Sequence, residues 1–164
     1  TGQPVTAESR NMLVESARIA RGNVLPLSQM KQSEYDGLII PGGFGAAKNL
    51  CTFAHQGSGG SVRKDLADIL ITMHKQGKPL GALCIAPAIL ALTFKGGAFE
   101  LTVGAKSEAS AEIEKLGHKH VVCQVSEAHF DRKNNVVSTP AYMYDGAPLN
   151  EIFEGIRKLV GYII

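Results

Sequence analysis

The sequence has no marked excess of charge of either sign. Its 17 Lys and Arg residues are interleaved with 15 Asp and Glu residues, which gives a formal net charge of +2 over 164 residues. Nucleic-acid-binding domains usually gather basic residues into a run or a stripe, and the sequence contains neither. No apolar stretch approaches the roughly 20 residues that cross a bilayer, and the first residues do not resemble a signal peptide. We therefore expect neither a nucleic acid nor a membrane as partner.

Closely paired cysteines are also missing. The three cysteines, Cys51, Cys84 and Cys123, are odd in number, widely separated and form no C-x-x-C pair. This spacing argues against a disulfide framework and against a zinc site, and it favours a reducing compartment. We expect Cys51 and Cys123 to be buried as small hydrophobic residues. No metal and no cofactor is expected.

Short apolar runs alternate with segments of helical periodicity over a length typical of one domain. Strands are predicted at 36–40, 80–84, 99–103 and 136–139, with further extended segments within 121–130 and a turn at 131–135. Helices are predicted from Ser61 to just before Gly77, over about 86–93, from a Ser107 cap to Gly117, and over Leu149–Val160. This order predicts an α/β fold in which helices cover both faces of a mostly parallel sheet.

Two of the predicted helices lie near the ends of the sequence. The first covers residues 6–21, with Thr6 as its N-cap and Gly22 closing it. The last has a wide apolar stripe that we expect to face a core, made of Leu149, Ile152, Phe153, Ile156, Leu159 and Val160.

Cys84 stands between a predicted strand and a predicted helix. Its small neighbours Gly81, Ala82 and Ala86 suit the sharp strand–turn–helix turn that lifts a nucleophile above a sheet. The amino terminus of the following helix would offer unpaired N–H groups that favour the thiolate, and the Ile85 N–H would point toward a developing oxyanion. A buried strand cysteine is the alternative, and the pattern alone leaves both open.

The run Pro-Gly-Gly-Phe-Gly-Ala-Ala-Lys-Asn at 41–49 follows the first predicted strand. A phosphate-binding loop requires G-K-[ST], which is absent, and a dinucleotide fingerprint would place Lys48 where its third glycine belongs. We favour an oxyanion hole shared with Cys84, since glycine backbones can present N–H groups to an anion. A turn that needs positive φ and nothing more remains open.

A cysteine nucleophile usually has a general base beside it, and none adjoins Cys84 in the sequence. Five histidines are candidates: His55, His74, His118, His120 and His129. Thr139 ends a predicted strand and could offer its hydroxyl to the site, although strand termination by Pro140 is the alternative interpretation.

These motifs together resemble the ElbB (enhancing lycopene biosynthesis protein) family of the class I glutamine amidotransferase-like and PfpI superfamily. The resemblance is carried by residues 8–11, 17–22, 41–50, 77–81, 84–87 and 139–143. It implies a flavodoxin-like three-layer sandwich with a nucleophile elbow, a single domain over 1–164, and usually a homodimer. Cys84 would be the catalytic residue. The oxyanion or substrate would be bound by Gly42, Gly43, Phe44, Asn49, Ile85 and Thr139.

The sequence departs from this family in two respects. Relatives begin with a further strand and helix, and a glutamate from that region reaches the elbow cysteine. This chain lacks that region, so we predict that its residues are only part of the native chain. In addition, amidotransferases place a histidine directly after or near the nucleophile, whereas here Ile85 follows Cys84. Gly104 and Ala105 occupy the region in which deglycase relatives carry a histidine. Glutaminase and efficient peptidase chemistry are therefore not expected.

The resemblance implies a weak glyoxalase activity that converts glyoxal to glycolate without glutathione. The substrate would be a small aldehyde, and the family is linked by name to isoprenoid biosynthesis. The expected location is cytoplasmic, or mitochondrial for a eukaryotic source. The alternative is a non-enzymatic redox-sensing or regulatory protein that uses Cys84, since an exposed reactive thiol serves sensing as well as catalysis.

Overall fold

A computed structural model describes residues 9–164, and the chain divides into two units between Lys31 and Gln32. In the first unit, helix α1 covers Met12–Ala20 and a short 3₁₀ turn covers Leu27–Gln29. The Asn11 side chain caps α1 by accepting hydrogen bonds from the N–H groups of Leu13 and Val14 at 2.9 and 3.2 Å.

The prediction that this helix already includes residues 9–11 was wrong, and the proposed Thr6 cap lies outside the described residues. The helix begins after Asn11, because the Asn11 side chain accepts hydrogen bonds from backbone N–H groups that the first turn leaves unpaired. At the other end, Arg21 rather than Gly22 adopts the left-handed conformation, with φ of 55°, and the Gly22 N–H donates to the Ala17 carbonyl at 3.2 Å.

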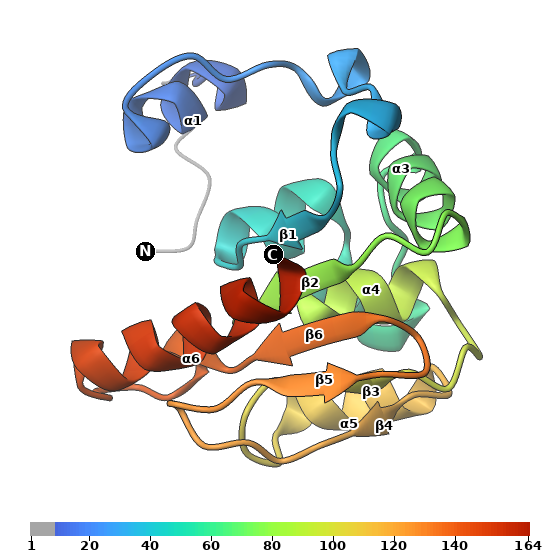
Figure 1. Cartoon of the computed structure of the whole chain (residues 1–164), viewed down its shortest axis with the longest axis vertical. Helices are drawn as coiled ribbons and strands as arrows, with labels where there is room; N and C mark the ends of the chain where they lie inside the picture. Colours follow the sequence, from blue (N-terminus) through green and yellow to red (C-terminus); the bar gives the residue numbers. More distant parts are fainter. Residues whose placement is uncertain (1–8) are drawn as a thin grey trace. The chain divides into compact units, whose positions relative to one another are not determined.

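The second unit is built on a four-stranded sheet with the order β1-β2-β6-β5 (Figure 1). Strands β1 (Leu38–Ile40), β2 (Leu80–Leu83) and β6 (Val136–Thr139) are parallel, and β5 (His129–Asp131) is antiparallel to β6. A separate parallel pair joins β3 (Glu100–Leu101) to β4 (Lys119–His120). The predicted α/β fold with a mostly parallel sheet is confirmed.

Five helices of the described second unit surround these strands, and short helical turns connect them. Their bounds are α2 Phe53–Gln56, α3 Lys64–Lys75, α4 Pro87–Thr93, α5 Glu108–Lys115 and α6 Leu149–Ile163. The short turns are Gln32–Glu34, the π-helical turn Ala46–Leu50, Gly57–Gly59 and Ala141–Met143. Figure 1 shows α6 in front of β2 and β6, with α4 behind the sheet, so the arrangement has three layers.

Two predicted elements are shorter than their patterns indicated. Helix α3 begins at Lys64, because Val62 instead forms an isolated antiparallel bridge with Cys51. The predicted strand 99–103 is regular only at Glu100–Leu101, and it pairs with β4 rather than with the main sheet.

The apolar face of α6 is narrower than its sequence stripe. Ile152 and Leu159 are buried, but Leu149 and Phe153 are 70% and 66% exposed. The helix comes closest to the sheet at Gly155, where an added Cβ would lie 2.5 Å from the Val125 carbonyl oxygen. This approach centres the buried face on Ile152, Gly155 and Leu159, and the 100° step per residue turns Phe153 outward.

Candidate active site

Cys84 occupies a sharp turn between β2 and α4. Its φ of 60° lies in the left-handed region, which is strained for a residue with a side chain. The Cys84 N–H donates to the Thr139 carbonyl of β6 at 3.0 Å, and the Ala86 N–H closes the turn on the Leu83 carbonyl at 3.1 Å. This strained strand-to-helix turn is the predicted nucleophile elbow.

Each of the three parallel strands is followed by a residue with positive φ. These residues are Gly43 after β1 (93°), Cys84 after β2 (60°) and Ala141 after β6 (45°). Because the carboxyl ends of parallel neighbours meet at one edge of a sheet, the three turns border a common region.

Gly42 lies directly beneath the elbow. A Cβ added there would be 2.6 Å from the Cβ of Cys84, 2.8 Å from the Leu83 carbonyl oxygen and 3.1 Å from the Cys84 sulfur. The chain can therefore bring these two strand ends together only because residue 42 has no side chain. This is a packing role; the predicted part of Gly42 in binding an oxyanion remains a prediction.

Backbone donors near Cys84 are fewer than the sequence indicated. The expectation of several unpaired N–H groups at the start of α4 was wrong, because Pro87 has none and the Ala88 N–H donates to the Ile85 carbonyl at 3.1 Å. Among residues 9–164, no protein acceptor receives the N–H of Gly43 or of Ile85. The predicted role of these two groups in binding an oxyanion remains a prediction.

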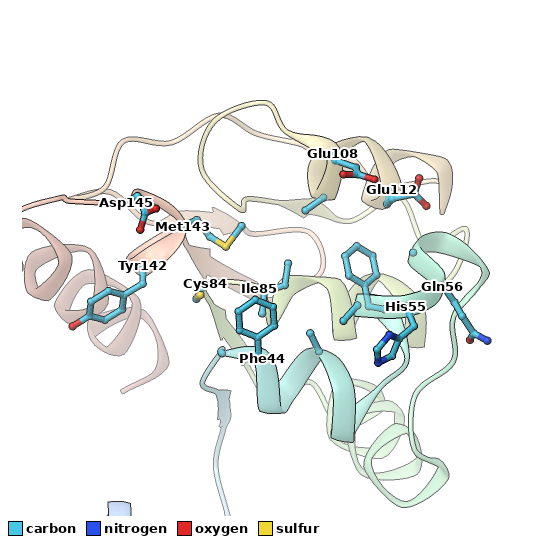
Figure 2. A pocket seen from close by; sticks show the side chains of 16 residues that line it. Phe44, His55, Gln56, Cys84, Ile85, Glu108, Glu112, Tyr142, Met143 and Asp145 are labelled. Carbon is cyan, nitrogen blue, oxygen red and sulfur yellow. The ribbon is translucent and has the colours of Figure 1, made fainter. Parts of the chain in front are cut away.

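A cavity of about 840 Å³ opens beside the elbow (Figure 2). Of the predicted site residues, it is lined by Gly43, Phe44, Cys84 and Ile85. Within the described part of the chain, its lining does not include Asn49, which is exposed, or Thr139. Thr139 is fully buried and its hydroxyl donates to the Glu127 carbonyl at 2.6 Å. Substrate roles for Asn49 and Thr139 stay predictions.

The cavity also has a lining that the sequence patterns did not reveal. Carboxylates come from Glu108 and Glu112 of α5 and from Asp145, which follows the turn after β6. Gln56, Phe53, Tyr142 and Met143 are further lining residues that were not predicted, and His55, one of the five candidate bases, also lines the cavity. No spacing in the sequence links these segments to Cys84, since only the tertiary fold brings them together.

Among residues 9–164, Glu112 is the one of these three carboxylates that forms an ion pair. It accepts hydrogen bonds from Lys115 Nζ at 2.5 Å and from the Ser58 N–H at 2.6 Å. The contact with Lys115, followed by that with Ser58, lowers the pKa of Glu112 to about 2, so this carboxylate stays ionised.

His55 lines the cavity, but Figure 2 shows it well apart from Cys84, with its imidazole directed downward and not toward the thiol. The other four histidines have partners elsewhere: His74 with the Asn134 carbonyl, His118 with Phe99 and Ala91, His120 with the Val103 N–H, and His129 with Glu100. The described residues therefore place no imidazole beside the thiol.

His118 has a structural role. It is buried, its Nδ1 accepts a hydrogen bond from the Phe99 N–H at 3.1 Å, and its Nε2 lies 3.0 Å from the Ala91 carbonyl oxygen. These partners require a neutral ring that is protonated on Nε2. Burial also lowers the pKa of His118.

The three cysteines differ in their surroundings. Cys51 and Cys123 are buried, with 3% and 6% of their surface exposed, and burial raises the pKa of both thiols. This confirms the expectation that they pack as hydrophobic residues. Cys84 is half-buried and faces the cavity.

A search of residues 9–164 finds no group of three or more His, Cys, Asp or Glu side chains placed to hold a metal ion. Within the same residues, every helix is too short or too polar to cross a bilayer.

Three known proteins are informative about this chain, although no protein-family model matches it. The human "Glutamine amidotransferase-like class 1 domain-containing protein 3, mitochondrial" is 45% identical over 172 residues. The aligned region covers 99% of this chain and 63% of the human protein, so the chain spans a little under two thirds of that relative.

Solved structures are similar as well. An isoprenoid biosynthesis protein with an amidotransferase-like domain from Ehrlichia chaffeensis has a TM-score of 0.84 and 33% identity, covering 96% of this chain and 72% of that one. A two-domain protein from Anabaena variabilis, with DJ-1/ThiJ/PfpI-like and ferritin-like domains, has a TM-score of 0.51 and 17% identity over 84% of this chain and 33% of that one. This second likeness concerns the fold alone.

Proposed function

Because the chain belongs to the family of class 1 glutamine amidotransferase-like proteins, we propose that it is an enzyme that uses Cys84 as a nucleophile on a carbonyl compound. The proposed reaction is of the glyoxalase type and needs no glutathione. The observation that carries this proposal is the strained left-handed Cys84, which faces the cavity beside two free backbone donors.

The surroundings of Cys84 favour an aldehyde over an amide. Hydrolysis of an amide requires a general acid to protonate the departing amine, a role that histidine fills in catalytic triads. Ile85 follows Cys84 in the chain, and the His55 ring lies apart from the thiol and does not point toward it. Addition of a thiolate to an aldehyde expels no leaving group, so it can proceed without such an acid.

The proposed steps balance without an external oxidant or reductant. The Cys84 sulfur adds to one carbonyl carbon of glyoxal, and the resulting alkoxide takes a proton from water to form a hemithioacetal. The hydrogen on that carbon leaves as a proton and a proton is returned to the second carbon, which becomes CH₂OH while the first becomes a thioester. Water then hydrolyses the thioester and releases glycolate and the thiol. The N–H groups of Gly43 and Ile85 would stabilise the oxyanions.

Membership of the ElbB branch, with its link to isoprenoid biosynthesis, is part of the proposal. It is supported by the name of the Ehrlichia relative, which includes isoprenoid biosynthesis. A mitochondrial location for a eukaryotic source is supported by the name of the human relative, with a cytoplasmic location otherwise. A homodimer is also proposed, and light scattering of the purified protein would measure it.

A second candidate function is redox sensing. It is favoured by the absence of an imidazole beside Cys84 within residues 9–164, together with the burial of Cys51 and Cys123. Oxidation by mild peroxide would then be confined to Cys84.

A pair of variants separates these two functions. Cys84→Ser is expected to lower kcat/KM for glyoxal about a hundredfold or more, because serine is a far weaker nucleophile at neutral pH. Cys123→Ala is the matched control and is expected to retain turnover, since Cys123 lies outside the cavity lining. Unchanged turnover in Cys84→Ser would eliminate the enzymatic proposal. Sulfinic acid at Cys84 in the absence of any turnover would favour the sensor, and mass spectrometry measures it.

A further inference from the structure

The cavity beside Cys84 is larger and more acidic than a two-carbon substrate requires. Its volume of about 840 Å³ lies in the range of pockets that hold ligands of drug size. Glu108, Glu112 and Asp145 line it, whereas no Lys or Arg does so among the described residues. A glyoxal molecule would fill a small part of this space and would make no use of the carboxylates.

The three carboxylates are not equivalent. Lys115 pairs with Glu112 and also acts on Glu108 through its charge. Within residues 9–164, no hydrogen bond or ion pair holds the carboxylates of Glu108 and Asp145. Figure 2 shows both above Cys84, Asp145 toward the left and Glu108 toward the right, so a molecule bound at the thiol would extend toward one of them.

Besides Lys115, a second cation lies near the edge of the cavity. The Lys48 ammonium group lies 5.2 Å from the centre of the Phe44 ring, and Phe44 is a lining residue. Lys48 is itself exposed and does not line the cavity. The carboxylates therefore outnumber the cations that face a bound molecule, and a concave site concentrates their field.

We infer that the substrate of this cavity is an α-oxoaldehyde whose remaining part is larger than that of glyoxal and carries a positive charge. The inference rests on the proposed function, and it names the substrate class of the same site. The thiol would attack the aldehyde carbon while Glu108 or Asp145 receives the cationic group. An anionic carbonyl compound would be repelled by the same carboxylates.

The charge at the thiol can be measured without any turnover. Methanethiosulfonate reagents carrying a trimethylammonioethyl or a sulfonatoethyl group react with a thiolate, which forms a disulfide and expels methanesulfinate. Their rates with Cys84 are divided by their rates with a small free thiol, and Cys84→Ser shows the background from the other cysteines. A carboxylate acting across ~8 Å of water changes the ratio of cationic to anionic rates about fivefold. We expect a normalised ratio well above one.

Variants identify the groups responsible. The double variant Glu108→Gln, Asp145→Asn is expected to lower the normalised ratio on the order of tenfold, and Lys48→Met is expected to raise it. Glu114→Gln is the matched control, because it removes one carboxylate from α5 outside the cavity lining, and it should leave the ratio nearly unchanged. A ratio near or below one, or an equal effect of Glu114→Gln, would overturn the inference.

Turnover provides the second measurement. Phenylglyoxals with a para trimethylammonio, tert-butyl or carboxylate group are matched in reactive centre, and the first two are also matched in shape. Each would yield the corresponding mandelate by the same internal transfer. We expect kcat/KM to decrease from the cation to the neutral compound to the anion, and the opposite order would refute the inference. Turnover of all three at equal kcat/KM would keep the enzyme and refute the charge preference. A high methanethiosulfonate ratio without any turnover would refute the enzyme and with it this substrate assignment.

Discussion

Replacing Gly42 with alanine tests whether close packing beneath Cys84 sets the geometry of the elbow. The new methyl carbon would lie 2.6 Å from the Cβ of Cys84 and 2.8 Å from the Leu83 carbonyl oxygen. Favourable contacts between carbon atoms begin near 3.5 Å, so both distances are short by more than about half an ångström. Neither opposing atom can rotate away, because one is a Cβ and the other belongs to the backbone. Overpacking of this kind costs about 1–3 kcal/mol, and two fixed contacts place Gly42→Ala at about 2–3 kcal/mol.

Urea unfolding measures this cost, and the rate of Cys84 modification by neutral methyl methanethiosulfonate reports the movement of the thiol. Two neighbouring glycines supply controls. Gly45 has φ of −59° and ψ of −41°, and its added Cβ would be 3.9 Å from Asn49 Nδ2, so Gly45→Ala should stabilise the protein by about 0.5–1 kcal/mol. Gly43 faces open space but has φ of 93°, so Gly43→Ala should cost about 1–2 kcal/mol through backbone strain alone.

A free energy of unfolding for Gly42→Ala within about 0.5 kcal/mol of that of the unsubstituted protein, the usual range for surface changes, would refute the clash. Equal changes in the modification rate in Gly45→Ala and Gly42→Ala would show that the effect does not depend on contact with Cys84.

Other predictions concern the scaffold and are also measured by urea unfolding. Leu159→Ala should cost about 2–5 kcal/mol because its side chain is fully buried, whereas Leu149→Ala on the same helix should cost less than about 0.5 kcal/mol; equal costs would contradict the observed face of α6. Burial lowers the pKa of His118 in the folded state, so the unfolded chain takes up a proton first as pH falls below about 6.5. Stability should be fully present above that pH and decrease below it by at most about 1.4 kcal/mol per pH unit for this group, and His118→Gln should reduce the slope; an unchanged slope would refute this role. Ser107→Ala should cost about 1 kcal/mol, because the Ser107 side chain caps α5 by accepting from the Ser110 N–H at 3.3 Å, and no loss would contradict the capping role.

The strands of the main sheet could be predicted largely because each is a short run with a strong preference for extended backbone that ends at a turn. The runs at Leu38–Ile40 and Leu80–Leu83 are short and apolar, and Val136–Thr139 is short and rich in β-branched residues; each is a strand of the main sheet. Predictions were less accurate where tertiary contacts determine which strands pair or which face of a helix is buried. The alternation at 99–103 indicates a strand but does not specify its neighbour, and the stripe on α6 does not specify the residue at which the helix approaches the sheet.

The site was predictable where it depends on local geometry. Cys84 and Gly43 are found from the turn chemistry of a strand end, and the structure gives both a positive φ. The carboxylates of Glu108 and Asp145 could not be found in this way, because each belongs to an ordinary exposed segment until the fold brings it to the cavity. The donors at the start of α4 were overestimated because the sequence does not reveal that the turn itself uses them.

The left-handed conformation of Cys84 also bears on how a sequence of this family would drift. Glycine would remove about 1–2 kcal/mol of strain at this position, and the greater freedom of its unfolded chain would offset about 0.5–1 kcal/mol of that gain. These ranges leave a net gain for glycine of about 0–1.5 kcal/mol, and glycine would also lose the contacts of the Cys84 side chain with the core around Ala141 and Ile152. Stability alone therefore gives little reason to keep a thiol at this position. Where chains of this family keep Cys84, the sulfur must bring a benefit that exceeds any loss of folded protein caused by the strained backbone.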